Sequence, residues 1–267
     1  MKPITIDLHV HTCLSRCAKS EATVDSYIAA AEKQGLKTIC FTNHCWATQM
    51  PGMNDWYKGQ DIDHVMKIKE QIPKDTKGIR ILVGCETEYI GNGIAGLNRE
   101  LAECFDFVLI PANHFHMKGF TVPRDLGSGG PKEVSELLYR RFMEAACLGF
   151  GTAIAHPFIP LGFSEHEGYP PGWEADILNG ISDTMYENCF RAAASAGLAI
   201  EINIDTLLRP AANISALYSG IYTIARECGC KFTFGSDAHH PDNMTGYEKA
   251  KEFAEACGIT DDQVFVV

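Results

Sequence analysis

The 267-residue sequence predicts an α/β fold in which parallel strands close into a single barrel. Apolar, β-branched runs alternate with helix-like segments along the chain, as in a βαβ fold. The strands are continuous apolar runs, which is typical of a parallel sheet buried on both faces. Histidine or a carboxylate follows six of the first seven strands. In a barrel these strand ends converge on one face, whereas an open sheet would spread them along an edge.

The expected strands and helices follow from this alternation. We expect strands at residues 4–12, 38–42, 80–84, 107–111, 152–155, 198–202 and 231–234, with 264–266 as a candidate eighth strand. We expect helices at residues 24–34, 61–72, 97–104, 132–148, 182–196, 216–228 and 247–256, several of them closed by glycine. Long Gly- and Pro-rich loops, 121–131 and 158–172, follow the fourth and fifth strands. No segment resembles a linker, so residues 1–267 are expected to form one domain.

Composition narrows the class of protein. A hydrophobic content of 46% excludes a disordered chain, and no apolar run approaches the roughly 18 residues of a membrane span. The first strand begins directly after Pro3, so we expect no signal peptide and a cytoplasmic location. Eleven cysteines without a C-x-x-C pair indicate reduced thiols, mostly in the core. The net charge of −11 argues against long nucleic acids as partners.

The residues at the strand ends predict a metal site. His9 and His11 are two apart on a strand, so their side chains share a face. Taken singly, each residue has an ordinary explanation, as when Asp237 would cap a helix. Taken together, such accidents at one end of six strands are improbable. The full set is His9, His11, His44, Glu86, His114, His156, Asp237 and His239.

Mixed imidazole and carboxylate ligands suit Zn, Mn or Fe better than Mg or Ca. Eight ligands are too many for one ion at four- to six-fold coordination, so two or three divalent ions are implied. Glu86 is the natural bridge between two of them. Two ions held about 3.5–4 Å apart can activate a hydroxide for displacement at phosphorus.

Six motifs, taken in this order, resemble the polymerase and histidinol phosphatase (PHP) superfamily. They are D-L-H-V-H-T (7–12), T-N-H (42–44), G-C-E (84–86), A-N-H (112–114), A-H-P (155–157) and S-D-A-H (236–239). The resemblance spans nearly the whole chain. It implies a distorted, TIM-like (β/α)7 barrel with two or three metals at the carboxyl ends of the strands, and the cleavage of phosphoesters.

The resemblance also implies which residues bind each metal ion. One metal would take His9, His11, Glu86 and Asp237; a second would take Glu86, His114 and His156; a third would take His44 and His239. The family usually offers a further His or Asp where this chain has Arg16 and Cys17. Either Cys17 ligates as a thiolate, or the Arg16 guanidinium occupies the place of the third cation and leaves a dinuclear enzyme. Asn43 also replaces the usual aspartate of T-D-H.

Three segments resemble the histidinol phosphatases within this superfamily: 86–89, 114–120, and 201–203 followed by Arg209. They imply hydrolysis of a small phosphomonoester by a metal-bound hydroxide, with L-histidinol phosphate as the best substrate candidate. Glu86 and Asp237 would fix the ions, and His116 would protonate the leaving group or hold the phosphate. Substrate contacts are expected from Arg209, Lys118, Asn203 and Arg16.

Two alternatives stay open from the sequence. One is a phosphodiesterase or exonuclease-like hydrolase that acts on small nucleotides. The other is a non-catalytic metal-binding or regulatory protein, in which the departures at Arg16 and Asn43 mark a loss of activity. The expected partner is a small phosphorylated molecule rather than a membrane. The identity of the metal, the presence of a third ion and the oligomeric state are left open.

Overall fold

The computed structural model describes residues 1–208 and 212–267, and in this part of the chain seven strands form one parallel sheet. Their order is β1 (Ile6–Val10), β2 (Thr38–Phe41), β3 (Arg80–Glu86), β6 (Phe107–Pro111), β7 (Ala153–Ala155), β8 (Ala199–Asn203) and β9 (Phe232–Gly235). The edges meet just beyond β9, where Asp237 N donates to His9 O at 2.8 Å and His11 N donates to Ala238 O at 3.0 Å. The predicted α/β barrel is confirmed.

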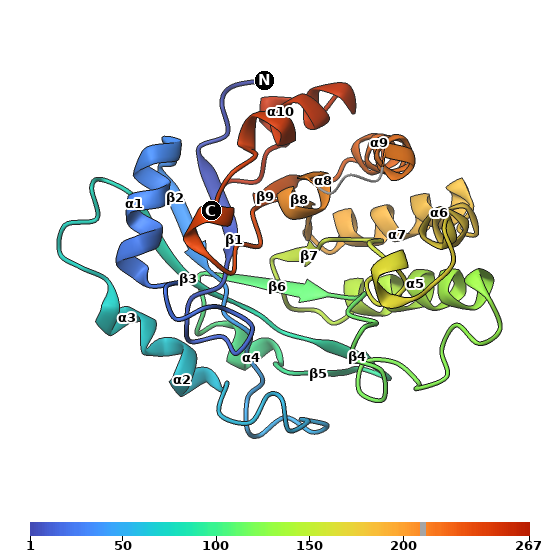
Figure 1. Cartoon of the computed structure of the whole chain (residues 1–267), viewed down its shortest axis with the longest axis horizontal. Helices are drawn as coiled ribbons and strands as arrows, with labels where there is room; N and C mark the ends of the chain where they lie inside the picture. The colour runs from blue at the N-terminus through green and yellow to red at the C-terminus, as the bar shows by residue number, and fades with distance from the viewer. Residues whose placement is uncertain (209–211) are drawn as a thin grey trace.

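Helices surround this sheet (Figure 1). Strands and helices alternate because local signals end each helix; in α1 (Val24–Gln34), Thr23 forms a capping box and Gly35 ends the helix at φ 74°. The other long helices are α5 (Pro131–Ala146), α7 (Asp183–Ser195), α9 (Ala212–Glu227) and α10 (Tyr247–Ala256). Shorter helices are α2 (Ile62–Met66), α3 (Ile68–Gln71), α4 (Arg99–Ala102), α6 (Trp173–Asn179) and α8 (Ile204–Leu208).

Some expected elements are wrong in detail. The helix expected at 61–72 is divided into α2 and α3. The one expected at 97–104 is shortened to α4, because Cys104 N donates a hydrogen bond to Leu101 O, only three residues earlier. Residues 264–266 do not form an eighth strand; Val264 makes one parallel bridge to Phe232 after a tight turn at Asp261–Gln263. The hairpin of β4 (Tyr89–Gly91) and β5 (Ile94–Ala95) was not predicted.

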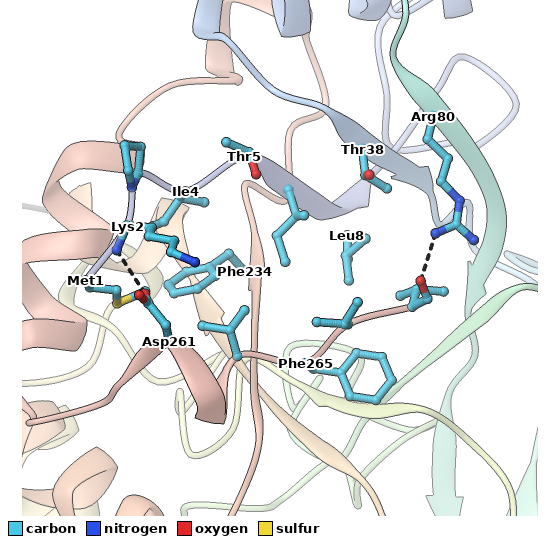
Figure 2. Close-up of a pocket in the computed structure, with 15 residues that line it drawn as sticks. Met1, Lys2, Ile4, Thr5, Leu8, Thr38, Arg80, Phe234, Asp261 and Phe265 are labelled. Carbon is cyan, nitrogen blue, oxygen red and sulfur yellow. Dashed lines mark hydrogen bonds between the residues drawn. The ribbon is translucent and has the colours of Figure 1, made fainter.

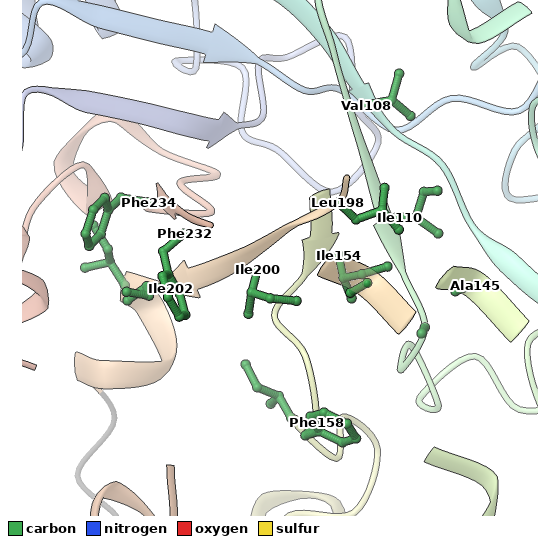
Figure 3. Close-up of a cluster of buried hydrophobic side chains, with 14 of the residues drawn as sticks. Val108, Ile110, Ala145, Ile154, Phe158, Leu198, Ile200, Ile202, Phe232 and Phe234 are labelled. Atoms are coloured by element: carbon green, nitrogen blue, oxygen red, sulfur yellow. The ribbon is translucent and has the colours of Figure 1, made fainter. Parts of the chain in front are cut away.

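Two apolar layers flank the barrel wall. Alternation along β6 turns Leu109 into the barrel interior, while Val108 and Ile110 face the helices. Figure 3 shows part of the outer layer, where Ile154 and Ile200 lie near Phe158. The ring of Phe158 stacks on Phe142 of α5 at 4.9 Å between centroids. This contact fixes the start of the loop that follows β7.

The amino ends of the strands form the opposite end of the barrel. A cavity of about 340 Å³ lies there, lined by apolar side chains such as Ile4, Leu8 and Phe265 (Figure 2). Arg80 Nη1 closes one side by donating to Val267 O at 2.7 Å. The ionisable residues that follow the strands are at the other end.

All eleven cysteines are free, but Cys104 and Cys147 are exposed rather than in the core. Within the described residues, no helix is both long enough and apolar enough to cross a membrane.

Candidate metal centre

The ends of the strands bring the predicted ligands into one cluster. His9 and His11 leave β1 side by side, with their Nε2 atoms 3.0 Å apart. Asp237, just after β9, places Oδ1 3.4 Å from His9 Nε2 and 3.3 Å from His11 Nε2. His114, after β6, and His156, after β7, bring their Nε2 atoms to 3.2 Å. Residues far apart in sequence therefore meet in a space of a few ångströms.

Glu86, the last residue of β3, lies between two groups of histidines. Its Oε1 is 3.0 Å from His156 Nε2 and 3.6 Å from His114 Nε2. Its Oε2 is 3.3–3.5 Å from nitrogens of three other histidines, His9, His11 and His44. The two oxygens of one carboxylate thus face different sets of nitrogens. This is the arrangement that a bridging carboxylate requires.

Most of these imidazoles are held in place by a contact of Nδ1, on the side of the ring away from the cluster. Nδ1 of His9 lies 2.6 Å from Glu201 Oε1, and Nδ1 of His114 lies 2.5 Å from Glu88 Oε1. Asn113 Oδ1 accepts from Nδ1 of His156 at 3.0 Å. Such contacts fix the tautomer and leave Nε2 as the free lone pair that faces the cluster.

The charges of the cluster are strongly coupled. Burial would raise the pKa of Glu86, but His44, His9 and His114 outweigh it and hold that pKa well below its usual value. Burial would lower the pKa of His9, but Asp237, Glu201 and Glu86 raise it well above its usual value. Glu86 is therefore ionised, and without a metal ion the cluster draws protons to balance its charge.

A third group of donors lies at the mouth of the cluster. Atoms of His11, Cys17, His44 and His239 that can bind a metal all lie within 4.8 Å of one another. Cys17 rather than Arg16 faces this position. The Arg16 guanidinium donates to the carbonyls of Asp55, at 3.1 Å, and Lys58, at 2.8 Å. The alternative in which Arg16 replaces a third cation is therefore wrong, and its contact with substrate is not supported by this geometry.

The donor set fits divalent metal ions. His44 Nδ1 is buried and makes no hydrogen bond, although Glu86 Oε2 lies 3.3 Å away. The Nε2 atoms of His9 and His11 lie 3.0 Å apart, a hydrogen-bond distance, so in the metal-free protein a proton occupies the space between them that a metal ion would take. Metal ions bound here would give His44 Nδ1 a partner and would also lie between His9 and His11. Imidazole with carboxylate is a typical ligand set for Zn, Mn or Fe.

The expected substrate-binding residues occupy different places. Lys118 and His116 line a cavity of about 570 Å³ above Glu86 and Asp237. Asn203 is buried and does not reach this cavity; its Nδ2 lies 3.3 Å from Asp237 Oδ2, so it supports that ligand instead. Arg209 lies outside the residues that the structure describes.

Sequence reasoning missed the supporting role of Glu201. It is buried in β8, where Oε1 contacts His9 and Oε2 accepts from His156 N at 2.6 Å. The signal was present: a carboxylate within an apolar parallel strand must find a buried partner. Ser15 was also missed; its Oγ accepts from His44 N at 3.0 Å and lies 3.4 Å from His11 Nδ1.

Backbone geometry marks the same region. His156 and Asp237 both adopt positive φ angles, of 30° and 54°, which cost energy in non-glycine residues. Gly235 precedes Asp237 by two residues and allows a close approach. A Cβ atom at Gly235 would lie 2.2 Å from Glu201 Oε1 and 2.4 Å from His9 Cβ.

Comparison with known proteins gives one family and a consistent fold. Residues 7–257 match the PHP domain. A probable phosphatase of Syntrophotalea carbinolica is 26% identical over 259 residues, covering 97% of this chain and 90% of the relative. A probable histidinol-phosphatase of Deinococcus radiodurans is 27% identical over 272 residues, covering 95% and 94%.

Two solved structures share the fold. The histidinol phosphate phosphatase of Lactococcus lactis, complexed with zinc, L-histidinol and phosphate, superimposes with a TM-score of 0.65 at 18% identity, covering 96% of this chain and 94% of its own. The putative histidinol phosphatase of Listeria monocytogenes gives a TM-score of 0.68 at 15% identity, covering 91% and 99%. At these identities the likeness is one of fold.

Proposed function

The chain belongs to the PHP domain family, and from this premise we propose that it is a metal-dependent phosphatase that hydrolyses a small phosphomonoester. The names of its relatives support the reaction class. Free cysteines throughout the chain agree with a reducing compartment, and we place the enzyme in the cytoplasm.

The position of Glu86 carries the proposal. A buried carboxylate with one oxygen toward His114 and His156, and the other toward His9 and His11, is suited to hold two cations at once. A structural carboxylate would instead be neutralised by one or two donors. The second oxygen would then have no reason to face a separate histidine group.

We assign the ligands by these contacts. His9, His11, Glu86 and Asp237 would hold one ion, and Glu86, His114 and His156 a second. His44, His239 and Cys17 are proposed for a third position. Bound divalent ions supply positive charge that polarises a phosphoryl group and lowers the pKa of water.

The remaining cavity residues have separate tasks. Lys118 lines the cavity, and the contact of its Nζ with the Tyr169 hydroxyl holds the ammonium at the cavity wall, where it can face the bound substrate. Desolvation and the neighbouring His114 and His156 lower the pKa of His116 to about 4. The His116 ring lies 5.2 Å from that of His114, between centroids, at the cavity wall, and we assign it a hydrogen bond to the phosphate.

The test is turnover with a matched substrate pair. Zinc- or manganese-loaded protein should hydrolyse p-nitrophenyl phosphate, and L-histidinol phosphate, the substrate candidate from the sequence, is assayed beside it. Hydrolysis of bis-p-nitrophenyl phosphate should be much slower; a preference for the diester would contradict the proposal. Glu86→Gln should abolish turnover with the circular dichroism spectrum retained. Activity of Glu86→Gln within tenfold of the wild type would refute its bridging role.

A further inference from the structure

The cavity above the metal centre is larger than a phosphate needs. Its volume of about 570 Å³ falls in the range of sites that bind small organic molecules. Its floor is formed by metal-ligand candidates, including Glu86 and His114. Its walls carry the side chains of Trp56, Met117 and Phe120. These walls are the surfaces that would face an organic group attached to a phosphate at the floor.

The aromatic walls are fixed by contacts beneath them. The Trp56 ring is edge-on to His44, with 5.0 Å between centroids, and to Tyr57, with 4.7 Å. Tyr57 is fully buried, and its hydroxyl donates to Glu88 Oε1 at 2.8 Å. Phe120 packs on Tyr57 at 5.9 Å. Trp56 and Phe120 are thus held on a rigid base, and such surfaces favour a flat, apolar group.

The charges of the cavity disfavour an amine on the substrate. Of the described residues that line it, the carboxylates are Glu86 and Asp237, and both face the histidine cluster. Lys118 Nζ lies 4.8 Å from the Tyr169 ring centroid and 4.9 Å from that of Phe163, so its cation is held in position. A substrate ammonium would find a fixed like charge and, among the described residues that line the cavity, no carboxylate outside the metal cluster.

We propose that this site selects phosphomonoesters with a flat, uncharged organic group and discriminates against amino-alcohol phosphates, L-histidinol phosphate among them. The inference rests on the proposed function, since it takes the phosphate to sit at the metal centre. It sets the substrate class apart from the amino alcohol bound in the Lactococcus lactis structure. Trp56 and Lys118 are the residues that determine the specificity.

The experiment uses pairs that differ by the amine alone. L-phenylalaninol phosphate is compared with 3-phenylpropyl phosphate, and L-histidinol phosphate with 3-(imidazol-4-yl)propyl phosphate. We expect the amine-free member of each pair to have a kcat/KM at least tenfold higher. The matching phosphonates, which cannot be hydrolysed, should show the same preference by calorimetry with zinc-loaded protein. Equal or tighter binding of the amine in both pairs overturns the inference.

Variants assign the selectivity to residues. Trp56→Leu should reduce the preference for phenyl phosphate over glycerol phosphate about tenfold, and Trp56→Phe should retain most of it. Lys118→Gln should reduce the difference in binding affinity between amine-free and amine-bearing phosphonates. Unchanged ratios in both Trp56→Leu and Lys118→Gln contradict the assignment. Selective phosphonate binding without hydrolysis would support the inference and refute the proposed function. Rapid hydrolysis with a preference for amine-bearing substrates would support the proposed function and refute the inference.

Discussion

His9 Nδ1 lies 2.6 Å from Glu201 Oε1, and the second oxygen of the same carboxylate accepts from His156 N. One buried side chain on β8 therefore orients a candidate ligand after β1 and another after β7. Neither oxygen of Glu201 faces the cavity. Its role is to position ligands rather than to touch substrate.

Glu201→Gln should weaken zinc binding by about 10- to 100-fold, since replacing the partner of a metal-ligating histidine typically costs that much. The amide can accept through one atom only, so either His9 or His156 loses its partner. Competition with a chromophoric chelator measures the affinity. Glu136→Gln, on the exposed face of α5, is the matched control. Equal affinity in the two variants would show that Glu201 does not act through the ligands.

Gly235→Ala tests the close approach at the end of β9. The added methyl group would overlap Glu201 Oε1 and His9 Cβ, so we expect a loss of about 1–3 kcal/mol in the free energy of unfolding. Zinc affinity should fall as well. Gly220→Ala, in α9 with open space around the new Cβ, should instead be neutral or stabilise by up to about 1 kcal/mol. Chemical denaturation with and without zinc measures both. Unfolding free energies that match for the two variants would rule out this close approach.

The barrel and the identity of the cluster could be predicted because both depend on local patterns. Apolar runs mark the strands, and the residue type that follows each strand marks the site. The hairpin of β4 and β5 also had a local signal, Asn92-Gly93, which favours a tight turn, but the short strands around it did not stand out.

The supporting contacts could not be predicted because they join residues far apart in sequence. Nothing near Arg16 indicates that its guanidinium binds carbonyls about forty residues away, at Asp55 and Lys58. The pairing of Glu201 with His9 spans 192 positions. The prediction that Arg209 contacts substrate phosphate stays a prediction, since it lies outside the described residues.

Cys17 should give the third position a sulfur ligand. In the metal-free protein, burial together with Glu86 and Asp237 raises the pKa of its thiol to about 12, so a thiolate forms there only beside a cation. Cobalt-loaded protein should show thiolate-to-cobalt charge-transfer absorption in the near ultraviolet. Cys17→Ser should lose that absorption and bind one ion fewer. Cys13→Ser, a cysteine of the same loop outside this group of metal-binding donors, is the control; identical spectra for both variants would exclude Cys17 as a ligand.

Zinc binding should strengthen as the pH rises from about 6 to about 8. Burial lowers the pKa of His114, but Glu88 and Glu86 raise it to about 9, and the pKa of His9 is also raised. Both histidines are thus protonated in the metal-free protein at neutral pH, and the metal must displace these protons. Higher pH weakens this competition. Calorimetry in buffers of different ionisation enthalpy should detect proton release at pH 7; binding that releases no protons and does not vary with pH would contradict the charge state.

We assign one multinuclear metal site to the ends of strands that are distant in sequence. Anomalous diffraction at the zinc edge from crystals of the zinc-loaded protein tests it most directly. We expect two or three peaks, one between His9, His11, Glu86 and Asp237 and one between Glu86, His114 and His156. A single peak that lacks Glu86 as a ligand, or no peak among these residues, would contradict it.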